Sequence, residues 1–279
     1  MRLSVELVPR DHGSLAAQLE ELRCLGRVDT VNVPDLRQFE LRGWQAALQA
    51  RAAGPWTPVP HFRAAEVLRD AAAGWPALAS LVRAGVTEVL VVSGDAPLAV
   101  GGAGQATAWG GAATGSPAAT GGGAASESPA AAPSDVPTPA VAAIRALTAA
   151  HPRLRVYAAL DPYRSGFAAE LAYAEEKLAA GAQGLFTQPF FDLRLLQVWQ
   201  ELVAGVEVFW GVTSVTSERS QRYWLSRNRA VFPAGFEPTL AWHRELAGRV
   251  LDHVAGSAGH LYFMPIRVGV RDWLGDLLA

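Results

Sequence analysis

The 279-residue chain has almost no cysteine, and this scarcity excludes two kinds of stabilising site. Cys24 is the only cysteine, so an intrachain disulfide and a zinc site built from cysteines are both excluded. The six histidines offer no pair at zinc-ligand spacing with a third ligand nearby, so they give no argument for a metal. We therefore expect a protein of the reducing cytoplasm that holds no metal.

Long apolar runs and an excess of one charge are also missing. No uncharged apolar run approaches the length that spans a bilayer, and Glu6 interrupts the first apolar run, which argues against a signal peptide. The net charge is −2 and the pI is near 6.3, without the basic patch that nucleic-acid binding needs. We expect a small-molecule partner, with no nucleic acid and no membrane.

Three common motifs of nucleotide-binding proteins and hydrolases are absent or incomplete. The glycines of Gly101-Gly-Ala-Gly104 are not followed by a helical pattern, so they do not support a dinucleotide fingerprint. The chain contains no phosphate-binding P-loop and no Gly-x-Ser-x-Gly elbow. Any nucleotide or acyl chemistry would therefore need another kind of site.

The apolar residues, half of the chain, follow a pattern in which strand-like and helix-like segments alternate. This alternation predicts parallel strands with helical crossovers. Eight such units in a chain of this length favour a (β/α)8 barrel, a single domain over 1–279, rather than an open doubly wound sheet. The expected strands are 2–8, 27–33, 56–62, 87–92, 153–160, 184–188, 206–212 and 260–265, and the expected helices are 14–25, 39–52, 76–84, 139–150, 168–180, 193–203, 218–229, 238–255 and 270–278.

Residues 98–138 interrupt this pattern after the fourth expected strand. They are almost wholly Gly, Ala, Ser, Thr and Pro, a composition that cannot bury a core. The segment is also too long for an ordinary connection. We predict a flexible insertion within the barrel; the composition favours a dispensable segment over an active-site lid, and both readings stay open.

The stretch Gly181–Asp192 places a polar amide at the end of a buried strand. Pro189 ends the strand because it cannot donate to a ladder, and Gln188 stands just before it, beside Phe190 and Phe191. Ligands of α/β folds bind at the carboxyl ends of strands, so Gln188 is a candidate site residue. A glutamine that merely caps the strand end is an equally weighted alternative.

Two carboxylates stand on or just after expected strands. Glu6 lies within the first strand, where burial of its charge would be costly and partial protonation would suit a general acid. An outward-facing strand position is the alternative. Asp95 follows Gly94, so backbone and carboxylate can both approach a ligand. Its alternative is a turn-forming aspartate before Pro97.

The chain resembles methylenetetrahydrofolate reductase, a flavin-using (β/α)8 barrel enzyme, over nearly its full length apart from 98–138. The motifs are moderately specific together and in this order, and weak singly. They are Ser4-Val-Glu6-Leu-Val-Pro9 against S-F-E-F-x-P, Pro60-His61 against a P-H pair, Val92-Ser-Gly94-Asp95-Ala-Pro97 against L-R-G-D-x-P, Lys177-Leu-Ala-Ala-Gly181-Ala182 against K-x-x-A-G-A, Thr187-Gln188-Pro-Phe-Phe191-Asp192 against T-Q-x-F-F-D, Gly211-Val212 with Pro233 against the seventh strand and helix, and the segment 260–267 against the last strand.

The resemblance implies a role for four residues of the folate site. Glu6 would be the general acid that protonates the folate on the way to an iminium ion. Asp95 and Gln188 would hydrogen-bond the pterin, and Arg267 would contact the substrate. A hydride acceptor that must become a cation needs a proton donor and a nearby anion, which agrees with the residue types.

The positions that hold the flavin in this family are mostly altered. Ser93 stands where the family has arginine, and the segments 160–164 and 32–34 lack the family's Tyr-Pro-Glu-x-His and Thr-Tyr-Gly patterns. His61 and Lys177 remain as candidate cofactor contacts, which alone make a poor FAD site. The use of FAD is therefore uncertain, whereas NAD(P)H is expected as the reductant.

Three functional hypotheses follow from this comparison. The first is reduction of 5,10-methylenetetrahydrofolate to 5-methyltetrahydrofolate in one-carbon metabolism and methionine biosynthesis, with hydride passing directly from NAD(P)H. The second is a non-catalytic folate-binding or regulatory barrel, and the third is a flavoenzyme with rearranged FAD contacts. Five tryptophans crowd the last third and suit the core or a subunit contact, so a homo-oligomer is a further expectation: Trp199, Trp210, Trp224, Trp242 and Trp273.

Overall fold

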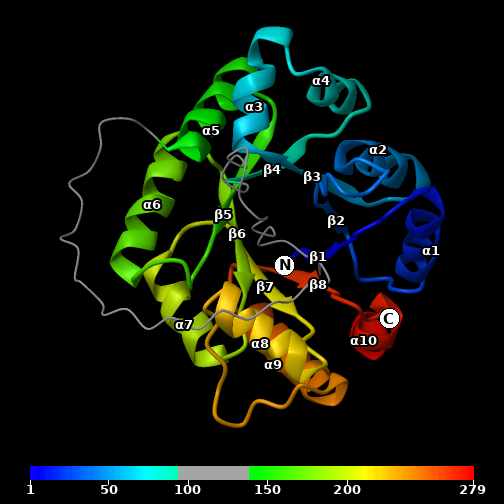
Figure 1. The fold of residues 1–279 in the computed structure, drawn as a ribbon, viewed down its shortest axis with the longest axis vertical. Helices are drawn as coiled ribbons and strands as arrows, with labels where there is room; N and C mark the ends of the chain where they lie inside the picture. The colour runs from blue at the N-terminus through cyan, green and yellow to red at the C-terminus, as the bar shows by residue number, and fades with distance from the viewer. Residues whose placement is uncertain (94–137) are drawn as a thin grey trace, which may run out of the picture.

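Eight parallel strands close into a barrel in the computed structural model, which describes residues 1–93 and 138–279. The strand order follows the chain, and the last strand pairs with the first. Figure 1 shows the strands at the centre and the helices around them. The expected (β/α)8 barrel is confirmed. The strands are β1 (Leu3–Glu6), β2 (Thr30–Val33), β3 (Thr57–Arg63), β4 (Glu88–Val92), β5 (Arg155–Leu160), β6 (Gly184–Pro189), β7 (Val208–Thr213) and β8 (His260–Met264).

The helices pack their apolar faces on the outside of the barrel, and α10 closes the ring by packing against α1 and α9 (Figure 1). Within the described parts of the chain, no helix is long and apolar enough to cross a membrane. The helices are α1 (His12–Arg23), α2 (Gly43–Ala53), α3 (Ala64–Asp70) with the 3-10 turn η1 (Ala71–Ala73), α4 (Pro76–Arg83), α5 (Pro139–Ala150), α6 (Phe167–Ala179), α7 (Leu193–Leu202), α8 (Glu218–Arg227), α9 (Leu240–Ala255) and α10 (Val270–Leu278).

The start of α2 differs from the expected helix over 39–52. The helix begins at Gly43, because the Asp35 carboxylate accepts the Gly43 backbone N–H at 2.8 Å and holds the preceding Arg42 in an ion pair. A Cβ at Gly43 would lie 2.9 Å from the Pro34 carbonyl oxygen, so only glycine permits this approach. The sequence pattern also missed α3, a single short helix that buries few apolar side chains.

Two prolines lie within β3 without breaking it. Thr57 donates its backbone N–H to the Asp29 carbonyl beside β2, so alternate residues of β3 direct their N–H groups toward β2. Pro58 and Pro60 therefore face β4, and the pairing of β3 with β4 begins only at His61. Proline lacks a backbone N–H, and at Pro58 and Pro60 this group would point toward β4 before the two strands pair. No hydrogen bond of the sheet is therefore lost, and β3 remains a regular strand.

The interior of the barrel is filled by a separate apolar layer. The rings of Phe186 and Phe209 stack with centroids 4.1 Å apart, and Tyr157 meets both edge-on. This packing makes the interior a solid core rather than a channel. Its buried members are Val59, Leu90, Val92, Tyr157, Phe186, Phe209, Tyr262 and Met264.

Charged side chains close the amino-terminal end of the barrel. Arg2 pairs with Glu88 at 2.8 Å, Arg155 pairs with Glu207, and His260 lies 3.3 Å from the Glu207 carboxylate. The charged side chains described at this end thus form ion pairs with one another. The opposite end, where the carboxyl termini of the strands meet, is the end at which ligands bind in such barrels.

Candidate functional site

Glu6 ends β1 and directs its carboxyl group into the barrel. The side chain is only 4% exposed, and the Tyr262 hydroxyl of the interior core donates a hydrogen bond to Glu6 Oε2. Burial raises the pKa of Glu6 from 4.5 to about 7, although the Tyr262 hydrogen bond opposes the shift. The expected burial is confirmed and the outward-facing alternative is excluded, and the raised pKa is in the direction that the expected partial protonation requires.

A chain of hydrogen bonds runs from β1 to β3 beside this acid. Asn32 pairs with Glu6 in register, donates to Ser4 Oγ at 2.8 Å, and places its Oδ1 3.2 Å from His61 Nε2. Burial lowers the pKa of His61 to about 3, partly opposed by the charge of Asp35, so the imidazole is neutral. Because Asn32 Oδ1 can only accept, His61 carries its hydrogen on Nε2 in this contact.

Gln188 lies at the end of β6, where the strand is irregular. The register between β6 and β7 shifts between Phe186 and Pro189, and Thr187 Oγ1 accepts the Gly211 backbone N–H at 2.8 Å. Gln188 is 5% exposed, and its Oε1 is enclosed without a hydrogen-bond partner in the described chain. Irregular strand ends often re-aim a side chain next to a site, and a buried unpaired oxygen calls for a donor.

The two phenylalanines after Gln188 serve packing. Phe190 lies against Trp210 with ring centroids 5.9 Å apart, and Phe191 packs in another cluster with Trp224 and Phe232. Both are fully buried, so neither offers a face to a ligand. Of the expected tryptophans, Trp199, Trp210, Trp224 and Trp273 are buried in the protein itself, and Trp242 is partly buried.

Asp161 follows β5 at the level of Gln188, because Leu160 pairs in register with Thr187. Its pKa is raised, mainly by burial and also by the nearby charge of Glu170, while the Tyr163 backbone N–H donates to its Oδ1 at 3.0 Å. In the sequence, Asp161 stands out only because the segment 160–164 departs from the family pattern. An acid directly after a strand and before a proline is the signal that could have identified it.

Arg267 lies in the loop after β8 and lines the same pocket as Glu6. The pocket measures about 620 Å³ and opens between the loops that follow β1, β2 and β8. Arg267 has a positive φ of 59°, which is unusual for a residue with a side chain. Strained backbone of this kind concentrates at functional sites. The structure thus brings the expected residues Glu6 and Arg267 together.

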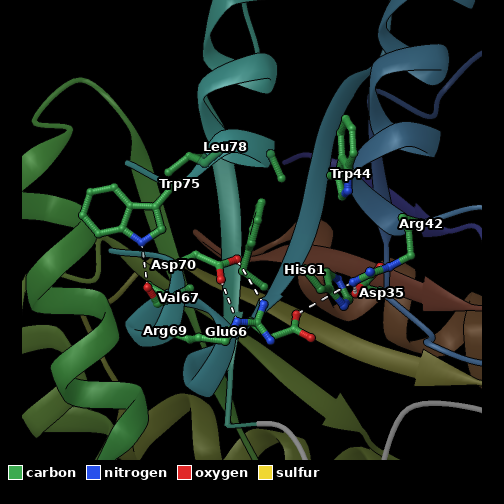
Figure 2. Close-up of a pocket in the computed structure, with 12 residues that line it drawn as sticks. Asp35, Arg42, Trp44, His61, Glu66, Val67, Arg69, Asp70, Trp75 and Leu78 are labelled. Atoms are coloured by element: carbon green, nitrogen blue, oxygen red, sulfur yellow. Dashed lines mark hydrogen bonds and ion pairs between the residues drawn. The ribbon is translucent and has the colours of Figure 1, made fainter. Parts of the chain in front are cut away.

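His61, one of the two expected cofactor contacts, borders a much smaller pocket between β3, α2, α3 and α4. This pocket measures about 110 Å³, well below the roughly 300–1,000 Å³ of ligand pockets. Figure 2 shows Trp44 and Trp75 on either side of it and charged side chains between them. Arg42 is engaged by the Asp35 carboxylate, so the space is too small and too strongly ion-paired for a flavin ring.

Lys177, the other expected cofactor contact, is engaged within the fold. Its ammonium donates to the Ala159 carbonyl of β5, lies 3.9 Å from Glu170 and stands 3.8 Å above the Tyr173 ring. Burial lowers the pKa of Lys177 to about 8, and the Glu170 charge opposes the shift. The described residues around His61 and Lys177 therefore do not fit a flavin, and a contact of either with a cofactor stays a prediction.

Asp95 lies outside the described residues, as does the expected insertion 98–138 apart from Thr138, the residue before α5. The structure adds Asn32 and Tyr262, which no sequence motif indicates as site residues. An asparagine at an inward position of a short strand was a usable signal for Asn32. The contact of Tyr262 with Glu6 joins the two ends of the chain, and no local pattern reports it.

Comparisons with known proteins agree with the fold. No protein-family model matches the chain, and no curated protein sequence matches it. Among solved structures, the chain is similar to oxaloacetate acetylhydrolase, with 10% identity and a TM-score of 0.49 over 95% of this chain and 75% of that chain. It is also similar to oxaloacetate acetylhydrolase in complex with the inhibitor 3,3-difluorooxalacetate, with 11% identity and a TM-score of 0.50 over 94% and 75%. At this identity the likeness concerns the fold alone, and the chain is a (β/α)8 TIM barrel.

Proposed function

We propose that this protein reduces 5,10-methylenetetrahydrofolate to 5-methyltetrahydrofolate with NAD(P)H. The observation that carries the proposal is Glu6, a buried acid with a pKa of about 7 at the carboxyl end of the barrel. Such a group is present in both protonation states near neutral pH, as a general acid must be. The sequence resemblance to methylenetetrahydrofolate reductase supplies the identity of the substrate.

The proposed reaction needs a proton before it needs a hydride. Protonated Glu6 donates to N10 of the folate as the bond between N10 and the bridging carbon breaks, which leaves the N5 iminium ion. A reduced nicotinamide supplies the hydride that converts this carbon to a methyl group. The hydrogen bond from Tyr262 holds the carboxyl group in place, and the carboxylate left behind stabilises the cation.

The other expected site residues, Gln188, Arg267 and Asp95, would hold the substrate. Gln188 has a buried oxygen that lacks a donor within the described chain, and an N–H of the pterin would supply one. Arg267 lines the pocket that reaches Glu6 and carries a positive charge for an acidic part of the substrate. Asp95 stays a proposed pterin contact on the strength of the sequence motif.

The residues at His61 and Lys177 do not fit a flavin, so we propose hydride transfer without one. Direct transfer requires both substrates on the protein at once. The pocket of about 620 Å³ beside Glu6 lies within the usual range for a site that holds one small-molecule ligand. We further expect a cytoplasmic location and a small-molecule partner. Self-association into a homo-oligomer stays a prediction that light scattering tests.

The experiment is anaerobic oxidation of NAD(P)H by flavin-stripped protein, started with 5,10-methylenetetrahydrofolate. We expect folate-dependent oxidation without added flavin, and an intersecting pattern of initial rates that reports both substrates bound together. Oxidation only after FAD is added would assign the reaction but refute direct transfer. Folate binding without oxidation under any condition would refute the reductase and favour a folate-binding barrel.

A further inference from the structure

The pocket beside Glu6 has a buried end and an exposed end. Glu6 is 4% exposed and forms the inner end, whereas Arg10 and Arg267 are exposed and stand at the outer end. Apolar side chains line the wall, including Phe39 and Val268. A ligand that fills the pocket would therefore place one part against an acid, a second against apolar groups, and a third between cations.

Neither guanidinium at the outer end has an ion-pair or hydrogen-bond partner within the described residues. The Arg10 guanidinium only stands 5.9 Å from the centroid of the Phe39 ring. Glu21, the other carboxylate of the pocket, already accepts the backbone N–H of Arg271 at 3.3 Å. The pocket thus carries two guanidinium groups at its entrance that form no ion pair with any described residue.

Backbone contacts and geometry define where both arginines stand, although no described residue forms an ion pair with their guanidinium groups. The Arg10 N–H donates to Ser14 Oγ at 2.9 Å, and the Arg10 carbonyl accepts the Leu41 N–H at 3.3 Å. Arg267 is held at its positive φ of 59°. Backbone that is already held in place reduces the conformational entropy that each arginine would lose on binding an anion.

We propose that Arg10 and Arg267 form an anion clamp for the acidic end of the substrate whose reacting part lies against Glu6. The proposal rests on the proposed function and adds Arg10, which no sequence motif singled out, as a specificity-determining residue. The ligand chemistry is a carboxylate or phosphate group remote from the reacting atoms. Such an anionic group has two possible sources in the proposed reaction: the glutamyl carboxylates of the folate and the phosphates of the nicotinamide dinucleotide.

The test is direct binding, measured by calorimetry at low and high salt. The probes are 5-methyltetrahydrofolate as monoglutamate and as tetraglutamate, and NADH and NADPH. The variants are Arg10→Gln, Arg267→Asn and their combination, with Arg51→Gln as the control because Arg51 is exposed on α2 and outside the pocket. Asparagine tolerates a positive φ, so Arg267→Asn preserves the backbone.

We expect Arg10→Gln to lower the affinity for one class of probe roughly tenfold. This loss of affinity should be smaller at high salt, because salt screens the attraction between the charges. A loss that grows with glutamate number identifies the folate tail, and a loss confined to the dinucleotides identifies their phosphates. The fold-loss of affinity in the double variant should be smaller than the product of the fold-losses in the two single variants, because both guanidinium groups bind the same anion. Unchanged binding of every probe by Arg10→Gln overturns the clamp while leaving the reductase intact. Failure of the wild type to bind any probe overturns both proposals.

Discussion

Replacement of Glu6 by glutamine should make the protein more stable and inactive at the same time. The carboxyl group is buried, and its pKa is raised from the ordinary 4.5 to about 7. Between these values the folded state binds more protons than the unfolded state, so stability falls as pH rises through this window. Glutamine keeps an oxygen for the Tyr262 hydroxyl and carries no charge, so the variant does not lose this stability.

The size of the effect follows from the pKa values. One pKa unit corresponds to about 1.4 kcal/mol, so the ionised carboxylate lowers the stability of the wild type by about 3 kcal/mol above pH 7. For a domain of this length, such a gain raises the melting temperature by on the order of 10 °C. Near pH 5 most of the difference should vanish, because the wild-type carboxyl group is then protonated in the fold.

The assay is thermal or urea unfolding of wild type and Glu6→Gln from pH 5 to pH 8, together with folate-dependent NAD(P)H oxidation. Glu201→Gln is the matched control, since Glu201 is exposed on α7 and should change neither quantity. Parallel stability curves of wild type and Glu6→Gln over this range would refute the raised pKa. Full turnover by Glu6→Gln would refute its role as the acid.

Three further predictions concern other parts of the barrel. Gly211→Ala should lower stability by roughly 1–3 kcal/mol, because its Cβ would lie 2.6 Å from the Thr187 carbonyl oxygen; urea unfolding measures this, and a neutral result would contradict the close approach. Arg267→Gly should leave stability unchanged or raise it by up to about 1 kcal/mol while weakening substrate binding, since glycine relieves the positive φ; a marked loss of stability would show that Arg267 serves the fold. The pKa of His260 is lowered, chiefly by burial, although Glu207 raises it, so its contribution to stability should be lost as pH falls below about 6.5. His260→Gln should therefore flatten the acid side of the stability profile, and an unchanged slope would exclude that role.

The sequence predicts the barrel because its signals are local. Alternation of apolar residues identifies strands, and eight strand–helix units leave few arrangements other than a closed barrel. Local pattern places Glu6 within an apolar strand but leaves both faces of the strand open to it, and only the contact with Tyr262 in the closed barrel shows that it faces inward. The elements that were misplaced, such as the start of α2, depend on the contact of Gly43 with Asp35 rather than on periodicity.

The site is less predictable because its properties depend on distant partners. Tyr262 and Glu6 are 256 positions apart, and no spacing rule connects them. Lys177 stands in a family-like motif, but its ammonium is engaged by Ala159 and Glu170, which only the fold reveals. Arg10 carries no motif and becomes notable only because no residue in the described part of the chain forms an ion pair with it.

The closure of the barrel has a consequence for when the chain becomes reactive. Glu6 belongs to the first strand, and its hydrogen-bond partner Tyr262 belongs to the last, so the two meet only after β8 has paired with β1. Until then the Glu6 carboxyl group is exposed to water and ionises like any other glutamate. The contact that positions the proposed acid is therefore a product of barrel closure, and a chain in which β8 has not paired with β1 would lack it.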